Sequence, residues 1–160
     1  WPVDRWGVLG DRLAAQYGAR ILVFGGPGEQ ELVTAVRARM RTGSTAVDAP
    51  PLRTAAALLA RCAFVVSNDS GLMHVAVSQR VHTFGLFGPT DERRTAPWGP
   101  FGHVVRAAGT QPNTAAGATL ANRTNGRPDP SLLALSVERV VAEVADALSG
   151  AQIGQPDMRS

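Results

Sequence analysis

The sequence predicts a single α/β domain with an open parallel sheet and helices on both faces. Short apolar runs alternate with amphipathic segments along most of the 160 residues. Turns rich in glycine or polar residues follow these runs, as at 25–28. The intervals leave room for one helix between successive strands, and a helical crossover is how neighbouring parallel strands are joined.

Composition narrows the classes of function. A hydrophobic content of 44% and a charged content of 18% are typical of a folded domain. All sixteen basic residues are arginine, and they are scattered among few aromatic residues, so a nucleic-acid surface is not expected. The single cysteine, Cys62, excludes an internal disulfide and a cysteine zinc cluster. No apolar run reaches the roughly 20 residues that span a bilayer.

The first part of the chain predicts helices and strands in alternation. Apolar residues recur at helical spacing over 4–17, and Gly18 ends that helix. The run Ile21-Leu22-Val23-Phe24 is expected to be a strand buried on both faces. The same signals predict a helix over 29–40, a weakly marked strand over 42–47 and a helix over 52–61.

The next part repeats the pattern. A strand is expected at 64–66, and a helix that carries Leu72, Val75 and Ala76 follows it and ends near 79–80. Further strands are expected over 81–87 and 103–105.

The last part is mostly irregular before one final helix. Residues 108–130 lack periodicity and predict a long, partly disordered loop. Ser136 is expected to cap the final helix, with Gly150 just beyond its end. The apolar stripe of that helix comprises Val137, Val140, Val141, Val144 and Leu148. Residues 1–150 then form the domain, and 151–160 are a flexible tail.

Ligands of open parallel sheets bind beyond the carboxyl ends of the strands. That rule selects three loops, 25–29, 67–74 and 88–91. In the second, a strand passes almost directly into a helix, which leaves unpaired N–H groups and a positive dipole end for phosphate or carboxylate. Gly71 admits a ligand close to the backbone, and His74 lies one turn into the helix.

Other interpretations of these residues are open. A dinucleotide fingerprint at 25–28 lacks its third glycine, and Pro27 removes one N–H donor. Glu29 is either a favourable charge in a first helical turn or an acceptor for ribose hydroxyls. Asp69 is either a helix cap or part of the anion site. His74 is either a buried core histidine or a phosphate donor.

A metal site is not predicted. The three histidines lack the spacing of paired ligands, and His82 and His103 are expected to be structural.

Four segments together resemble a known family. In chain order they are WPVDRW, ILVFGGPGEQE, LLARCAFVVSNDSGLMHVAV and LFGPTDERRTAPWG, and they resemble the C-terminal half of the lipopolysaccharide heptosyltransferases, glycosyltransferase family 9. The resemblance covers about 1–99 and the final helix, whereas 108–130 matches nothing recognisable.

The resemblance implies a GT-B enzyme, in which two Rossmann-like halves enclose a cleft. The C-terminal half holds a nucleotide-sugar donor, typically ADP-heptose, and the N-terminal half holds the acceptor and supplies a carboxylate base. Transfer inverts the anomeric configuration and needs no metal or other cofactor. The process implied is lipopolysaccharide or cell-envelope glycan synthesis in the bacterial cytoplasm, peripheral to the inner membrane.

Carried onto this sequence, the resemblance assigns roles to three groups of residues. The donor diphosphate would contact Asp69, Ser70, Gly71, Leu72 and His74. The ribose or nucleoside would contact Gly26 and Glu29. The sugar side would be bordered by Gly88, Pro89 and Thr90.

No catalytic residue is assigned to this chain, because the base belongs to the half that the resemblance does not cover. The basic residue that relatives carry just before their Trp-Pro pair also falls outside the sequence. We therefore expect donor binding without turnover by this chain alone. The alternatives are a non-catalytic nucleotide-sugar-binding module and half of a GT-B nucleotide-sugar epimerase.

Overall fold

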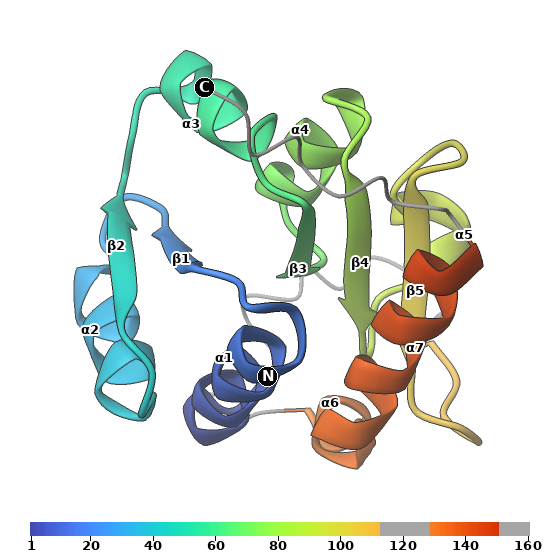
Figure 1. The fold of residues 1–160 in the computed structure, drawn as a ribbon. Helices are drawn as coiled ribbons and strands as arrows, with labels where there is room; N and C mark the ends of the chain where they lie inside the picture. The colour runs from blue at the N-terminus through green and yellow to red at the C-terminus, as the bar shows by residue number, and fades with distance from the viewer. Residues whose placement is uncertain (113–128, 151–160) are drawn as a thin grey trace.

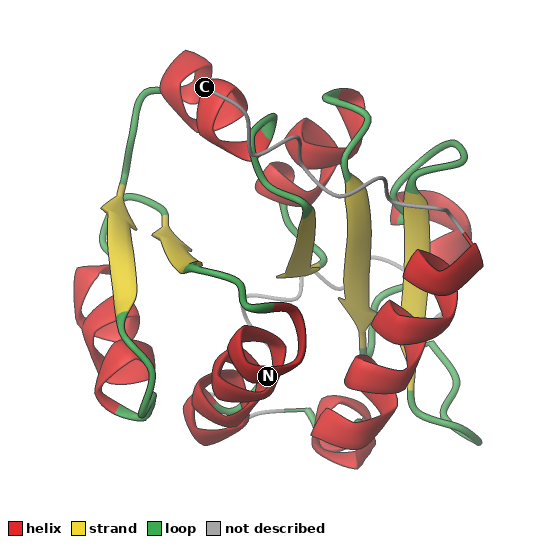
Figure 2. Ribbon diagram, in the orientation of Figure 1, coloured by secondary structure: helices red, strands yellow, loops and turns green. Residues whose placement is uncertain are grey.

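The computed structural model describes residues 1–112 and 129–150. Helices and strands alternate along these residues, and helices pack around the strands (Figures 1 and 2). In chain order the elements are α1 (Val3–Tyr17), β1 (Ile21–Gly25), α2 (Gln30–Ala38), β2 (Ser44–Asp48), α3 (Leu52–Leu59), β3 (Phe64–Asn68), α4 (Gly71–Ser78), β4 (His82–Phe87), α5 (Glu92–Thr95), β5 (Gly102–Arg106), α6 (Pro130–Ala134) and α7 (Val137–Gly150).

All strand pairs are parallel, which confirms the α/β class and the strand direction predicted from the sequence. β1 pairs with β2 in a register that places Val23 opposite Ala46. β4 lies between β3 and β5. The expected single sheet is instead divided into a two-stranded and a three-stranded sheet, because β1 does not pair with β3.

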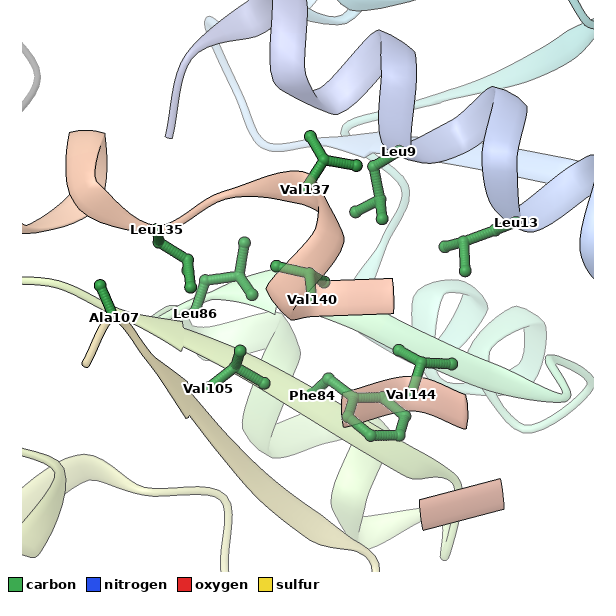
Figure 3. Packing of buried hydrophobic residues seen from close by; sticks show 10 residues of the cluster. All are labelled: Leu9, Leu13, Phe84, Leu86, Val105, Ala107, Leu135, Val137, Val140 and Val144. Carbon is green, nitrogen blue, oxygen red and sulfur yellow. The ribbon is translucent and has the colours of Figure 1, made fainter. Parts of the chain in front are cut away.

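The main core lies on one face of the three-stranded sheet (Figure 3). It joins residues of α1, β4, β5 and α7 with the residue after β5 and the linker before α7, namely Leu9, Leu13, Phe84, Leu86, Val105, Ala107, Leu135, Val137, Val140 and Val144. Each large apolar side chain that leaves water here stabilises the fold by about 1.5–3 kcal/mol. The apolar stripe predicted for the last helix therefore packs as expected.

The expectation that β1 is buried on both faces is wrong. Leu22 is 36% exposed, and within β1 only Gly25 is fully buried. β4, by contrast, is buried from Thr83 to Phe87. The physical reason is that β4 has a strand partner on each edge, whereas β1 has one on a single edge.

Two short helices escaped sequence analysis. α5 and α6 have four and five residues, too few for a helical period to show. The sequence marks each helix only by an aspartate at the cap position. The Asp91 carboxylate accepts from the Arg93 N–H, and the Asp129 carboxylate accepts from the Ser131 N–H.

The boundaries of the last helix were partly predicted. Ser136 caps it as expected, and its hydroxyl accepts from the Arg139 N–H at 3.2 Å. Gly150 lies inside α7 rather than beyond its end. The predicted tail at 151–160 and most of the predicted loop at 108–130 lie outside the described residues.

The amino end of α1 is fastened to the segment before α7. The Trp1 indole N–H donates to the Leu135 carbonyl oxygen at 2.9 Å. The Arg5 guanidinium donates to the Leu133 and Leu135 carbonyl oxygens, each at 2.6 Å. These bonds hold the start of α1 near the carboxyl end of β4, because Gly88, which follows β4, packs against Leu132 of α6.

Of the helices described, none has the length and apolarity to cross a membrane.

Candidate functional site

The loop between β3 and α4 is the centre of the candidate site. Ser70 occupies the cap position before α4 with an extended backbone, at φ −150° and ψ 165°. The Ser70 side chain makes no capping hydrogen bond to this helix, and its hydroxyl lies 3.1 Å from that of Ser67. The first-turn N–H groups and the dipole of an uncapped helix attract an anion.

Asp69 is not the cap of this helix, which corrects one of the two interpretations drawn from the sequence. Its Oδ2 accepts a hydrogen bond from the Thr95 hydroxyl at 2.8 Å. Thr95 is the last residue of α5, so this bond ties the β3–α4 loop to the segment that follows β4. Asp69 therefore orders the β3–α4 loop through its contact with α5.

Gly71 and His74 both face open space. A Cβ atom built on Gly71 would meet no atom within 4 Å, so packing within the chain does not require glycine there. The free space lets a ligand reach the backbone N–H groups. His74 is exposed, whereas Met73 and Ala76 of the same helix are fully buried. The interpretation of His74 as a core histidine is therefore wrong.

The loop after β1 is closed by Glu29. The Gly26 N–H donates to Glu29 Oε2 at 2.6 Å, and the Glu29 N–H donates back to the Gly26 carbonyl oxygen at 3.1 Å. Gly28 has φ 82°, a left-handed conformation that favours glycine. Glu29 immediately precedes α2 rather than lying in its first turn, and its exposed carboxylate uses one oxygen for Gly26.

These two loops open onto one cavity between the sheets. Its volume is about 1350 Å³. Gly25, Gly26 and Glu29 line it from the β1 side. From the β3 side it is lined by Ser67, Asn68, Ser70, Gly71 and Leu72. The structure thus brings together two of the three loops selected from the sequence. His74 is not among the lining residues.

The third loop, 88–91, lies apart from this cavity. A separate cavity of about 410 Å³ is lined by Pro89, Thr110, Gln111, Asp129, Pro130 and Ser131. A Cβ on Gly88 would overlap the Leu132 side chain, so glycine is required there for α6 to pack. The Asp69–Thr95 hydrogen bond connects α5, which follows the 88–91 loop, to the β3–α4 loop.

Arg106, at the end of β5, holds the third loop in place. Its guanidinium donates to the carbonyl oxygens of Gly88 and Thr90 and to the carboxylate of Glu92. The Glu92 carboxylate also accepts a hydrogen bond from the backbone N–H of Glu92. This bond and the contact with Arg106 hold the pKa of Glu92 below its usual value. Arg106 was not predicted from the sequence, although its place at the carboxyl end of a strand was a usable signal.

The histidines away from the site are structural, as predicted. His82 Nδ1 lies 2.9 Å from His103 Nε2, and the two rings are stacked. Both residues lie near the amino ends of their strands, away from the candidate loops. Across 1–112 and 129–150, no cluster of three or more His, Cys, Asp or Glu side chains is placed to hold a metal ion.

Parallel strands joined by crossover helices define a Rossmann-like α/β fold, the architecture of one half of a GT-B glycosyltransferase, and the comparisons with known proteins agree. Residues 1–122 match the family model described as Glycosyltransferase family 9 (heptosyltransferase). The chain therefore belongs to glycosyltransferase family 9.

Relatives and solved structures support this assignment. Lipopolysaccharide heptosyltransferase 1 of Escherichia coli O18:K1:H7 is 34% identical over 115 residues, which cover 69% of this chain and 34% of that protein. E. coli ADP-heptose lps heptosyltransferase II has the same fold, with a TM-score of 0.78 and 24% identity over 95% of this chain and 43% of that one.

A third similar protein has been solved with ADP. E. coli heptosyltransferase WaaC matches with a TM-score of 0.70 and 25% identity, over 92% of this chain and 39% of the solved chain. Throughout, the chain spans much less than the full length of its relatives, from 26% to 34% of the curated proteins.

Proposed function

We propose that this chain is the donor-binding part of an inverting, metal-independent glycosyltransferase that acts in lipopolysaccharide or cell-envelope glycan synthesis. The donor is an ADP-linked sugar of the heptose class. The observation that carries the proposal is the uncapped start of α4, which shares a cavity with the Glu29 loop. The similar heptosyltransferase WaaC, solved with ADP, supports the choice of nucleotide.

The donor diphosphate binds at the start of α4. Backbone N–H groups of Gly71 and Leu72 and the hydroxyl of Ser70 donate to its oxygens, with the helix dipole behind them. His74 adds a donor from the exposed face of the helix. When the sugar leaves ADP, negative charge grows on the diphosphate, and prearranged donors of this kind stabilise it. No metal is required for that step.

The nucleoside lies toward the loop after β1. Glu29 is already oriented by the Gly26 N–H, so its second carboxylate oxygen accepts from a ribose hydroxyl without a large loss of side-chain freedom. The loop that contains Gly88, Pro89 and Thr90 borders the sugar. Asp69 and Thr95 set the distance between that loop and the diphosphate site.

The catalytic carboxylate and the acceptor site belong to a second Rossmann-like half of the enzyme. This chain alone then binds the donor and does not turn it over. The complete enzyme acts in the cytoplasm at the membrane face, where a lipid-linked acceptor is accessible. Sugar transfer by this chain alone, detected as acceptor glycosylation, would contradict this division of labour.

Calorimetric titration of the chain with ADP, UDP and GDP tests the donor site. We expect ADP to bind weakly, and His74→Ala to weaken it about tenfold, which corresponds to about 1.4 kcal/mol for one charge-assisted hydrogen bond. Gln79→Ala, at the opposite end of α4, is the matched control and leaves binding unchanged. Absence of ADP binding at millimolar concentration, or equal binding by the His74 variant, refutes the site.

The ribose assignment has its own comparison. ADP and 2′-deoxy-ADP differ by the hydroxyl that Glu29 is proposed to bind. The unaltered chain should prefer ADP, and Glu29→Ala should bind both nucleotides equally, since the variant lacks the acceptor. A preference that persists in Glu29→Ala would remove Glu29 from the ribose site.

A further inference from the structure

Helix α5 is held in place by contacts at both of its ends. It is a single turn of four residues that directly follows the 88–91 loop. One turn is unstable by itself in water, because so few hydrogen bonds do not offset the cost of starting a helix. The position of α5 is therefore set by the Asp91 cap and by side chains from two other parts of the fold.

Arg106, the last residue of β5, fixes the amino end of α5. Its Nη2 donates to the carbonyl oxygen of Thr90 and to the carboxylate of Glu92, each at 2.6 Å. Its Nη1 donates to the carbonyl oxygen of Gly88. The side chain of Arg106 is 12% exposed and that of Glu92 is 30% exposed, so solvent weakens this ion pair less than one on the open surface.

The carboxyl end of α5 is tied to the β3–α4 loop. The Thr95 hydroxyl donates to Asp69 Oδ2 at 2.8 Å. Asp69 immediately precedes Ser70, which occupies the cap position of α4. α5 therefore connects the 88–91 loop to the turn that begins α4, and a shift at one end is transmitted to the other.

The 88–91 loop is also confined by α6. A Cβ atom on Gly88 would overlap the side chain of Leu132 and come within 3.1 Å of the Ser131 hydroxyl oxygen. The loop therefore cannot move closer to α6, while the Arg106 guanidinium holds its carbonyl oxygens. Together these contacts restrict the loop to one position.

Fixed spacing between two loops favours a ligand that contacts both of them. When the loops are already placed, binding of the second part of the ligand requires no further ordering of the protein. A nucleotide sugar has two such parts, the diphosphate and the sugar, whereas free ADP has only the first. A residue that sets the spacing should therefore affect the affinity for the nucleotide sugar and not the affinity for ADP.

We propose that Arg106 is a positioning residue for the donor sugar. Through Glu92 and α5, it fixes the 88–90 loop at the distance from the β3–α4 loop that an intact nucleotide sugar requires. This role rests on the proposed function, in which the 88–90 loop borders the sugar and the start of α4 binds the diphosphate. Arg106 acts through the loop rather than on the sugar.

Calorimetric titration of the chain with ADP and with ADP-heptose tests this role. Arg106→Lys keeps the positive charge but lacks the planar fork that holds separate acceptors. We expect it to weaken ADP-heptose binding about five- to tenfold, as for the loss of one hydrogen bond to a charged group, and to change ADP binding less than about twofold. Arg139→Lys, in the exposed ion pair of α7 with Glu143, is the matched control and should alter neither affinity.

Thr95→Val is a second variant that leaves the buried guanidinium in place, so the role stays testable if Arg106→Lys does not fold. It removes the hydroxyl that ties α5 to Asp69, and we expect the same selective loss of ADP-heptose affinity. The two substitutions together should weaken binding little more than either one alone, because both act through the position of α5.

Three results would overturn the role of Arg106 and leave the diphosphate site standing. They are equal losses of ADP and ADP-heptose affinity in Arg106→Lys, an unaltered preference for ADP-heptose in both variants, and equal affinity of the unaltered chain for the two nucleotides. In the double variant, losses that multiply would also overturn it. Absence of ADP binding by the unaltered chain would instead refute the proposed function, and the role of Arg106 with it.

Discussion

The three-stranded and two-stranded sheets differ in burial although their strands are similarly apolar. In β4, Phe84 is 0% and Leu86 is 1% exposed, whereas Leu22 in β1 is 36% exposed. β4 has neighbours on both edges and α7 over one face, and β1 has one neighbour. The apolar sequence of β1 is typical of a strand with a neighbour on each edge. Among the described residues, β1 has a neighbour on one edge only.

The largest expected effect on stability comes from making the same substitution, leucine to alanine, in a strand of each sheet. Leu86→Ala should lower the free energy of unfolding by about 2–5 kcal/mol, because it leaves a cavity in the core. Leu22→Ala removes the same atoms from a half-exposed site and should cost less than about 1 kcal/mol. Urea denaturation measures both. Equal losses would show that β1 is as well packed as β4.

The second comparison sets a packing glycine against a binding glycine. Gly88→Ala should lower the unfolding free energy by about 1–3 kcal/mol, because its Cβ overlaps Leu132. Gly71→Ala, with open space around it, should leave stability unchanged or raise it by up to about 1 kcal/mol through higher helix propensity. ADP binding measured by calorimetry should reverse the ranking, with loss in Gly71→Ala. Unaltered ADP affinity in Gly71→Ala would argue against anion binding at α4.

A third prediction concerns how the two-stranded sheet is attached. The Asp11 carboxylate of α1 accepts from the Thr42 hydroxyl at 2.6 Å and from the Thr42 and Arg41 N–H groups. These bonds, chiefly that from the Thr42 hydroxyl, hold the pKa of Asp11 below its usual value. Asp11→Ala should cost about 1 kcal/mol, since the acceptor of several exposed hydrogen bonds is lost.

The pH dependence of this attachment follows from the sign of the pKa shift. The stabilisation is present above about pH 3.9, the ordinary pKa of aspartate, and is lost as the pH falls through the lower folded pKa. Thermal unfolding of Asp11→Asn should lack that part of the acid sensitivity. An identical acid profile for the variant would contradict the role of Asp11.

The smallest expected effect lies in the three-stranded sheet. Burial, with the neighbouring His82, holds the pKa of His103 below its ordinary value, while Glu143 opposes this. The unfolded chain then binds a proton before the folded one does. Stability should therefore fall by less than about 1 kcal/mol as the pH drops below about 6.5, and His103→Gln should flatten this decline. A decline that is unchanged in the variant would locate the titrating group elsewhere.

Local patterns predicted the elements well and their assembly less well. The alternation of runs such as 21–24 with amphipathic helices gave the α/β class and the parallel direction, because periodicity and crossover rules are local. The division into two sheets was missed, since strand pairing depends on neighbours that no local pattern encodes. α5 and α6 were missed because their few residues are fixed by Asp91 and Asp129 caps rather than by a period.

The candidate site was predicted in outline. The rule for carboxyl ends of strands selected the loops that contain Glu29 and Ser70, and the structure places both on one cavity. The hydrogen bond from Thr95 to Asp69 spans 26 positions in sequence, so only the fold could show it. Arg106 stands at a strand end that the same rule could have selected, but its partners at positions 88–92 are brought to it only by the fold.

The most direct test of the account is the mapping of ADP on the protein by amide NMR shifts. With ADP added in increasing amounts, the N–H signals of Ser70, Gly71 and Leu72 should shift first and most, followed by Gly26 and Glu29. Gly99 and Gly109, whose loops do not line the cavity, serve as references and should not move. Shifts centred on any other loop, or none at millimolar ADP, would contradict the assignment of α4 as the diphosphate site.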